Sequence, residues 1–560
     1  MWEYDLDGTR RMKEKYRKFC LTFVVISILI MALVSAFNYF VDPYDMWGGG
    51  NIVGFNVYSP KAEPTDRMQK PVAFLQKKVK PEVVFIGTSQ FLYALDTDVY
   101  EELTGVEAYN FSVRAASIYE QRRILEHVIA NDGNLKKVYI GVVFLDFVDR
   151  EYCTLPMKDK SFEANESQYG KSFVIPHNYL RNLLSLDALK ESFIKILENH
   201  KNQYTNTFYM ESGKIYDEHL LRHFQFNHWW FNNTAATMAR NGDYRGIKLN
   251  RERVGELRRI VELCQEKNID YHVFICPVHA MQMELAAPVW PVYEEWKRAL
   301  VEIAPVMDFS GYNEMTMSPA KSGIVDEDTN PYFWDTMHMK PKVADLVMER
   351  LLGLEGNLPG FGVLLTKENI EQYLSELKSG RELWETVCPE SVEESRYFSG
   401  FSNVIPRALR DVAEVNGQKN LVSVDRVGRE IQVDYIDWRQ QTNKLEKSIS
   451  FEISLTQRNR LYIQGIRFVG LDEISNMYAV IENAEGSRYY ALTRPIYSEK
   501  IHDALAAKAD IVNGFMLRIP MWDVPVGEYR LFFVGVSADG AVHSSETMGT
   551  VKVTVPEKEV

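Results

Sequence analysis

The stretch Pro81-Glu-Val-Val-Phe-Ile-Gly-Thr-Ser-Gln90 decides the fold of this chain. Its apolar run, Val83 to Ile86, is short and rich in β-branched side chains, which is typical of a strand buried on both faces of a parallel sheet. Gly87 allows the backbone to turn sharply, so Thr88 and Ser89 stand at the carboxyl end of the strand. In open α/β sheets, ligands bind at that end. The stretch therefore predicts a functional site at Ser89.

A serine in this position becomes a nucleophile only when a base reaches it. The downstream stretch Trp334-Asp-Thr-Met-His338 offers one. Asp-x-x-His on a tight turn can place the imidazole of His338 beside Ser89 while Asp335 orients the ring. The structural alternative is that Thr88 and Ser89 cap the next helix, that Asp335 caps a turn, and that His338 is a surface residue. We favour the catalytic role for Ser89, His338 and Asp335.

The composition is that of a folded, acidic chain. Its 560 residues are enough for two or three domains, and 46% of them are hydrophobic. The formal net charge is −13 and there is no long basic run, so nucleic acid is not expected as a partner. The five cysteines, at positions 20, 153, 264, 276 and 388, form no Cys-x-x-Cys pair, which argues against a zinc ribbon or a thioredoxin-type site. The last four could pair in an oxidising compartment.

The N-terminal segment predicts a membrane anchor. Residues 19–41 form an uncharged apolar block that matches the ~20 residues needed to cross a bilayer as a helix. Basic residues cluster at 10–18, which places residues 1–18 in the cytoplasm as a tail and everything after Val41 outside. A signal peptide cleaved near Val34-Ser35-Ala36 and a buried globular helix are the alternatives. Because the block exceeds the usual ~7–15 apolar residues of a signal peptide, we expect an uncleaved, single-pass inner or plasma membrane anchor.

Strand and helix patterns alternate in residues 42–397. Apolar runs predict strands at 82–87, 109–112, 138–145, 271–276 and 306–309. Amphipathic runs predict helices at 115–128, 251–267, 290–303, 342–352 and 366–387. Residues 151–245 have no strand period and predict a helical insertion over the sheet. The alternation predicts a three-layer α/β domain with a mainly parallel sheet.

Residues 398–560 have a different sequence pattern, which predicts a linker followed by a β-sandwich. Short alternating runs predict strands at 430–438, 460–469, 477–481, 488–493, 515–519, 528–536 and 550–555. Turn signals such as Asn483-Ala-Glu-Gly486 and Ala538-Asp-Gly540 separate them. Several short strands with glycine-containing turns are typical of a sandwich.

These motifs resemble those of the SGNH (GDSL-type) hydrolase superfamily. More narrowly, they resemble its membrane-anchored bacterial branch, which works in alginate-type polysaccharide O-acetylation and teichoic acid D-alanylation. The similar stretches are Ile86-Gly-Thr-Ser89, Tyr109-Asn-Phe-Ser-Val-Arg-Ala-Ala-Ser117, Ile275-Cys-Pro-Val-His-Ala280, Asp308-Phe-Ser-Gly-Tyr-Asn313 and Asp335-x-x-His338. The resemblance covers roughly residues 38–390 and implies a flavodoxin-like, three-layer domain with Ser89 as nucleophile.

The sequence departs from the family pattern around the oxyanion hole. Thr88 replaces the aspartate of Gly-Asp-Ser, and residues 141–146 occupy the third-motif strand without its asparagine. The N–H groups of Ser89 and Gln90 are natural oxyanion donors, because a strand-to-helix turn points them at one spot. Further donor candidates, each also readable as an ordinary loop residue, are Asn110, Ser112 and Arg114.

Other histidines and aromatic residues allow two interpretations each. His279 follows a strand directly, and either binds acceptor sugar at the same rim or hydrogen-bonds a loop. His219 and His223 have metal-like i, i+4 spacing without the glutamate of a His-Glu-x-x-His site, so we expect no metal. His228-Trp-Trp-Phe231 either faces a sugar or packs in a core or lid, and we favour packing. No phosphate-binding glycine loop is present, and no cofactor is expected.

The resemblance implies an extracytoplasmic O-acyltransferase that moves an acyl group, expected to be acetyl, onto a cell-surface or secreted polysaccharide through an acyl-enzyme on Ser89. Because acetyl-CoA is cytoplasmic, it also implies a membrane-bound O-acyltransferase partner that passes the group across the membrane. Two alternatives stay open. One is a membrane-anchored carbohydrate esterase or deacetylase with the same triad, and the other is a non-catalytic envelope scaffold whose sandwich binds glycan or protein.

Overall fold

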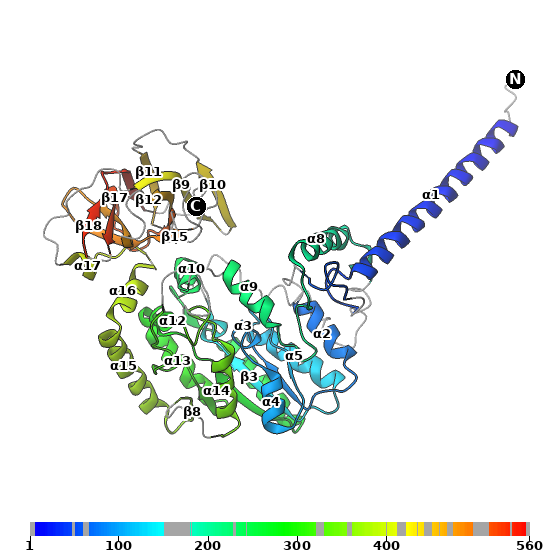
Figure 1. The fold of residues 1–560 in the computed structure, drawn as a ribbon, viewed down its shortest axis with the longest axis horizontal. Coiled ribbons are helices and arrows are strands. Elements are labelled where there is room, and N and C mark those ends of the chain that lie inside the picture. The colour runs from blue at the N-terminus through cyan, green and yellow to red at the C-terminus, as the bar shows by residue number, and fades with distance from the viewer. Residues whose placement is uncertain are drawn as a thin grey trace.

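The computed structural model describes residues 6–47, 51–59, 66–149, 180, 182–227, 231–241, 244–320, 330–354, 361–398, 400–410, 422–433, 435–441, 451–457, 460–467, 474–496, 514–537 and 540–555. These residues form a long N-terminal helix, a central α/β domain and a C-terminal β-domain (Figure 1). Cys153, the His228-Trp-Trp part of the aromatic cluster and most of the first third of the expected insertion lie outside the described residues.

The N-terminal helix α1 (Leu6–Val41) extends away from the rest of the chain (Figure 1). Its part Lys13–Val41 is long and apolar enough to cross a membrane, and none of its most apolar stretch is buried. The predicted apolar helix is therefore confirmed. Residues 6–18, which we placed in a tail, continue the same helix.

The central sheet has six strands in the order β2-β1-β3-β6-β7-β8. Their bounds are β1 (Val83–Ile86), β2 (Ala108–Asn110), β3 (Lys137–Val142), β6 (Asp270–Ile275), β7 (Val306–Asp308) and β8 (Val363–Leu365). The first five are parallel, and β8 joins the edge antiparallel to β7. After β1 the chain builds β2 on one side and later β3 on the other. The carboxyl ends of β1 and β3 therefore flank the switch point where ligands bind in doubly wound sheets.

Helices cover both faces of this sheet. Alternate residues of β1 enter two different apolar clusters, with Val84 and Ile86 in one and Val83 and Phe85 in the other. The first cluster draws on α5 (Ile118–Asn131), α11 (Arg251–Glu266), α13 (Trp290–Val301) and α15 (Ile370–Val387). The second draws on α4 (Thr97–Thr104), α12 (Ala280–Glu284) and α14 (Pro341–Leu351). The predicted α/β class with a mainly parallel sheet is confirmed.

The helical segment expected at 151–245 contains three helices in its described part. They are α8 (Leu186–Asn202), α9 (Asp217–Asn227) and α10 (Asn233–Asn241). Smaller elements of the domain are α2 (Asp66–Gln76), α3 (Ser89–Leu92), η1 (Phe144–Phe147), η3 (Ala287–Val289) and the two-strand pair β4 (Val148–Asp149) and β5 (Lys248–Leu249). The strand predicted to reach residue 145 ends at Val142, because Phe144 begins the 3₁₀ turn η1.

The C-terminal domain has two sheets that share one apolar core, which confirms a β-rich region there. One sheet contains β9 (Val422–Val433), β10 (Tyr435–Gln441), β12 (Arg460–Arg467), β15 (Arg494–Ile496) and β16 (Gly514–Pro520). The other contains β11 (Phe451–Thr456), β13 (Ile474–Glu482), β14 (Arg488–Leu492), β17 (Gly527–Ser537), β18 (Val542–Ser544) and β19 (Gly549–Thr554). The strand predicted at 430–438 is in fact parts of two strands, β9 and β10.

A packed helix, α16 (Pro389–Phe398), precedes the β-domain and ends at residue 398, where we predicted the linker to begin. Tyr397 in this helix is fully buried, and its ring lies 5.7 Å from the ring of Tyr478 in β13. Beyond it lies the short helix α17 (Arg407–Arg410). Arg245 of the α/β domain also pairs with Asp523 at 2.6 Å. The two domains are therefore joined by a buried aromatic contact and an exposed ion pair.

Candidate active site at the end of strand β1

The turn from β1 into α3 brings Ser89 to the edge of the sheet. Gly87 is not in the left-handed region, so it is not required for a sharp turn as we predicted. Its role is to make room, because a Cβ there would lie 2.4 Å from the ring of Phe91. The same ring excludes a side chain at Gly141 of β3, where a Cβ would lie 1.8 Å away. The single turn of α3 is thus pressed onto two strands through Phe91.

Ser89, His338 and Asp335 form one hydrogen-bonded chain. Ser89 Oγ lies 2.9 Å from His338 Nε2, and His338 Nδ1 lies 2.9 Å and 3.0 Å from the two oxygens of Asp335. A proton on Nδ1, which the carboxylate requires, leaves Nε2 to accept the serine hydroxyl proton. Asp335 is fully buried, and Ser89 is half-buried. The spacing therefore matches a nucleophile, a base and an orienting acid.

The non-catalytic roles that we considered for Thr88, Asp335 and His338 are found in the structure to different degrees. Thr88 precedes α3 but makes no side-chain cap, so the capping role weighed for it is not found. Asp335 does organise its own turn, since its Oδ1 accepts the N–H groups of Met337 at 2.8 Å and His338 at 2.9 Å. His338 is 6% exposed and not a surface residue. One carboxylate therefore both folds the turn and orients the imidazole.

Sequence reasoning missed Thr234 as a partner of the buried carboxylate. Its hydroxyl, at the start of α10, donates to Asp335 Oδ2 at 2.7 Å. The rings of Tyr93 and Phe224 lie 5.1 Å and 5.5 Å from the imidazole of His338. A threonine at the start of a helix gives no sign in the sequence that its partner lies about a hundred residues later. These contacts hold the imidazole in one orientation.

Two of the predicted oxyanion candidates have structural partners. Asn110 is fully buried, and its amide group donates to the carbonyls of Phe91 and Leu95, both at 3.3 Å. It therefore holds the α3 turn in place and does not line an open site. The Arg114 side chain is 8% exposed and its Nε donates to Asp66 at 2.7 Å.

The remaining oxyanion candidates have hydrogen-bond donors that no described residue occupies. Ser89 and Gln90 are the first residues of α3, and their N–H groups have no hydrogen-bond partner in the described part of the chain. The Ser112 hydroxyl is also buried without a partner among the described residues. Their role as oxyanion donors stays a prediction.

His279 is a buried structural residue and not a sugar-binding residue at the rim. It is 1% exposed, its Nε2 donates to the carbonyl of Ser318 at 2.7 Å, and its Nδ1 accepts the N–H of Met281. Burial lowers the pKa of His279 to about 4, so the ring is neutral near pH 7. The backbone N–H of His279 donates to the carbonyl of Thr336 at 3.0 Å. Of the two interpretations left open for His279, these contacts favour the loop hydrogen bond: the ring bonds Ser318, and the backbone N–H bonds the loop that carries His338.

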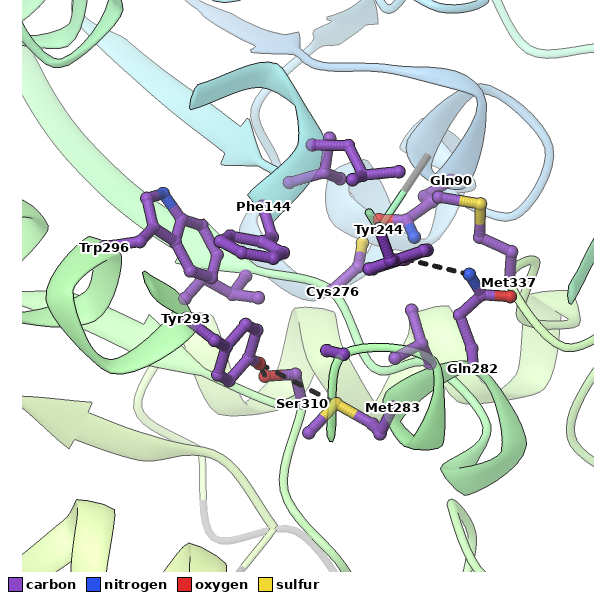
Figure 2. Close-up of a pocket in the computed structure, with 15 residues that line it drawn as sticks. Gln90, Phe144, Tyr244, Cys276, Gln282, Met283, Tyr293, Trp296, Ser310 and Met337 are labelled. Carbon is purple, nitrogen blue, oxygen red and sulfur yellow. Dashed lines mark hydrogen bonds between the residues drawn. The ribbon is translucent and has the colours of Figure 1, made fainter. Parts of the chain in front are cut away.

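An apolar pocket lies beside the triad, at the carboxyl ends of β3, β6 and β7 (Figure 2). Its cavity volume is about 50 Å³. Gln90 and Met337, neighbours of Ser89 and His338 in the sequence, lie at one end, and Phe144 and Trp296 lie at the other. A small apolar group attached near Ser89 could be accommodated in this pocket.

Two residues that line this pocket, Tyr293 and Ser310, contact a buried ion pair. Lys297 pairs with Asp308, and both side chains are inaccessible to solvent. Ser310 Oγ donates to Asp308 at 2.7 Å and lies 3.1 Å from both the ammonium of Lys297 and the hydroxyl of Tyr293. Burial lowers the pKa of Lys297, although the adjacent carboxylate opposes that effect. Each polar side chain of this cluster, Lys297, Asp308, Ser310 and Tyr293, has a partner within it.

No cluster of metal-ligating side chains occurs among the described residues. His219 Nε2 donates to the carbonyl oxygen of Asn206 at 3.0 Å, and its ring stacks on Tyr58 at 4.3 Å. His223 packs against Tyr93 at 5.0 Å. Four cysteines are free thiols: Cys20, Cys264, Cys276 and Cys388.

The chain matches no protein-family model, and no curated protein is significantly similar to it.

Proposed function

We propose that this protein is a membrane-anchored serine acyltransferase of the SGNH type that acylates carbohydrate outside the cytoplasm. The observation that carries the proposal is the chain from Ser89 through His338 to Asp335, with 2.9 Å at each link. A serine beside an imidazole whose other nitrogen faces a buried carboxylate is the arrangement that activates a hydroxyl for attack on an ester.

The first half-reaction forms an acyl-enzyme. Ser89 Oγ attacks the carbonyl carbon of the acyl donor while its proton passes to His338 Nε2, and Asp335 stabilises the resulting imidazolium. The oxyanion accepts hydrogen bonds from the N–H groups of Ser89 and Gln90. When the intermediate collapses, the bond to the leaving alcohol breaks and His338 protonates that alcohol. The acyl group then remains on Ser89.

The second half-reaction releases the acyl group to an acceptor. An acceptor hydroxyl gives its proton to His338 and attacks the acyl carbon, and Ser89 leaves and recovers its proton. A sugar hydroxyl in this position gives transfer, whereas water gives hydrolysis. The apolar pocket between Gln90 and Trp296 supports a small uncharged acyl group, with acetyl as our expectation.

The proposed location follows from α1. Its apolar part is long enough to cross a membrane, and the basic cluster at 10–18 favours a cytoplasmic N-terminus. The α/β domain then lies outside, where acetyl-CoA is absent. A membrane-bound O-acyltransferase partner supplies the acyl group across the membrane, and a cell-envelope or secreted polysaccharide accepts it.

The test uses the full-length protein in detergent with 4-nitrophenyl acetate. Intact-mass spectrometry should find an acetyl adduct on Ser89, and Ser89→Ala or His338→Ala should slow release of 4-nitrophenol by about 10³-fold or more. Ser379→Ala, on the exposed side of α15, is the matched control and should leave the rate unchanged.

Adding polysaccharide then separates the candidate activities. Acetyl transfer to glycan supports the transferase, and faster adduct loss to water without glycan labelling supports the esterase. Equal rates in the parent, Ser89→Ala and His338→Ala proteins, with no adduct, would support the scaffold and overturn the proposal.

A further inference from the structure

Large apolar side chains are exposed around the base of α1, where the helix meets the α/β domain (Figure 1). We call this group the collar. Its members are between 49% and 80% exposed, and they are Phe40, Ile52, Val53, Leu186, Phe193 and Leu197. They come from three separate parts of the sequence. Such a gathering on one side of a domain marks a contact with a membrane or another molecule.

Helix α8 leaves three of its large apolar residues exposed, which is unusual for a surface helix. Leu186, Phe193 and Leu197 recur at helical spacing on its exposed side. Its inward side carries Lys195 and Asn199, both fully buried. The polar inward side is explained by its partners, since Lys195 donates to a carbonyl in the turn after α1 at 2.6 Å. The outward apolar side has no such explanation within the described chain.

The collar is fixed to α1 by direct contacts. The rings of Phe37 in α1 and Phe193 in α8 lie 5.1 Å apart. Ser192 donates to the side chain of Asn38 at 2.9 Å, and both residues are buried. Helix α8 therefore cannot swing away from the end of α1 without exposing a buried polar contact.

The loop that carries Ile52 and Val53 is held to the same helix end. Asn56 donates to the carbonyl of Phe40 at 3.0 Å, and the ring of Phe55 lies 6.0 Å from the ring of Phe40. All parts of the collar thus have a set position relative to α1.

The length of α1 determines the depth of the collar in a membrane. A helix of ~20 residues spans the hydrocarbon core, so a helix that enters at Phe19 reaches the opposite edge near Asn38. The collar begins at that level. The rings of Tyr39 and Trp47 lie 5.7 Å apart there, and aromatic residues of this kind are enriched at the membrane–water interface.

We propose that the collar lies in the interfacial layer of the bilayer and seats the α/β domain against the membrane surface, with α8 parallel to that surface. The inference rests on the proposed membrane crossing of α1. Lys190 and Lys201 on α8 are exposed and can contact lipid headgroups, and Lys201 also pairs with Glu198 at 3.6 Å. The alternative occupant, a membrane protein, is an outcome of the test.

The test places a fluorophore at three sites of the full-length protein in phosphatidylcholine–phosphatidylglycerol vesicles. Cys20, Cys153 and Cys388 are first replaced by serine, and single cysteines are introduced as Leu197→Cys, Leu29→Cys and Leu383→Cys. Leu383 is the matched control, because it is 56% exposed, as Leu197 is at 58%, but lies on α15. Two quenching lipids are then used: one with a nitroxide near the headgroup, which tests Leu197→Cys and Leu383→Cys, and one with a nitroxide deep in the acyl chain, which tests Leu29→Cys near the bilayer centre.

The expected result is loss of fluorescence at Leu29→Cys and Leu197→Cys and none at Leu383→Cys. Quenching at Leu29→Cys without quenching at Leu197→Cys would overturn the lipid seat and leave the collar for a protein partner. Absence of quenching at Leu29→Cys would instead overturn the membrane crossing itself. Neither result depends on the acyltransferase proposal.

Discussion

The contact between Phe91 and the two glycines makes a specific prediction about how Ser89 is positioned. In Gly141→Ala, the nearest ring carbon of Phe91 would have to move by about 1.6 Å, from 1.8 Å to ordinary contact at 3.4 Å. Phe91 has no free space to move into, because it is fully buried and its ring meets Phe274 edge to face at 4.5 Å. The strain must therefore displace α3, and Ser89 begins that turn.

Two magnitudes follow from this geometry. Overpacking of a filled core costs about 1–3 kcal/mol, and we expect Gly141→Ala to destabilise the sheet by that amount. A displacement of a catalytic atom by ~1 Å costs about 10²-fold in rate, so ester hydrolysis should fall to a similar degree. In a Phe91→Ala background the added methyl group has room. Gly141→Ala should then cost almost nothing.

The assay is hydrogen exchange of peptides from β1 and β3 in the four proteins of the double-mutant cycle, together with their rates on 4-nitrophenyl acetate. Gly133→Ala serves as the control, since a Cβ there meets nothing within 4 Å. If Gly141→Ala destabilised the sheet equally with and without the Phe91 ring, the proposed contact would not be the reason for glycine at this position.

Three further predictions concern the surroundings of the triad. Thr234→Val removes the hydroxyl donor to Asp335 and should cost about 1.5–3 kcal/mol by urea unfolding and lower the esterase rate, whereas Thr234→Ser should retain both. Asn110→Asp places a carboxylate against two carbonyls and should destabilise the domain by about 3 kcal/mol or more in the same assay. The pKa of His279 is lowered from 6.5 to about 4, so its stabilising contribution is complete above pH 6.5 and is lost as the pH falls toward 4. His279→Gln should therefore lose less stability than the parent across that range, by up to about 3 kcal/mol, and an identical pH dependence would contradict the assignment.

Local sequence patterns predicted the parts of the site that depend on local geometry. The apolar run 83–86 is a strand because its β-branched residues pack on both sheet faces, and Ser89 follows it at the carboxyl end. The Asp-x-x-His turn also forms through its own short-range bonds, from Asp335 to the N–H groups two and three residues on. Each of these features is encoded within about ten residues.

The features that were missed depend on partners far away in the sequence. Asn110 and His279 have polar side chains that follow strands, so they resembled rim residues, and only their buried carbonyl partners show them to be structural. The role of Gly87 depends on the aromatic ring of Phe91, which packs against it. The edge strand β8 has only three residues, which is too short a run to show the alternation of apolar and polar residues that predicts a strand.

The helical segment from α8 to α10 connects the membrane end of the molecule with the triad. Its first helix packs on α1 through Phe193, its second places Phe224 against His338, and its third supplies Thr234 to Asp335. A covering insertion would need none of these three contacts. One stretch of chain therefore contacts both α1 and the candidate catalytic residues His338 and Asp335.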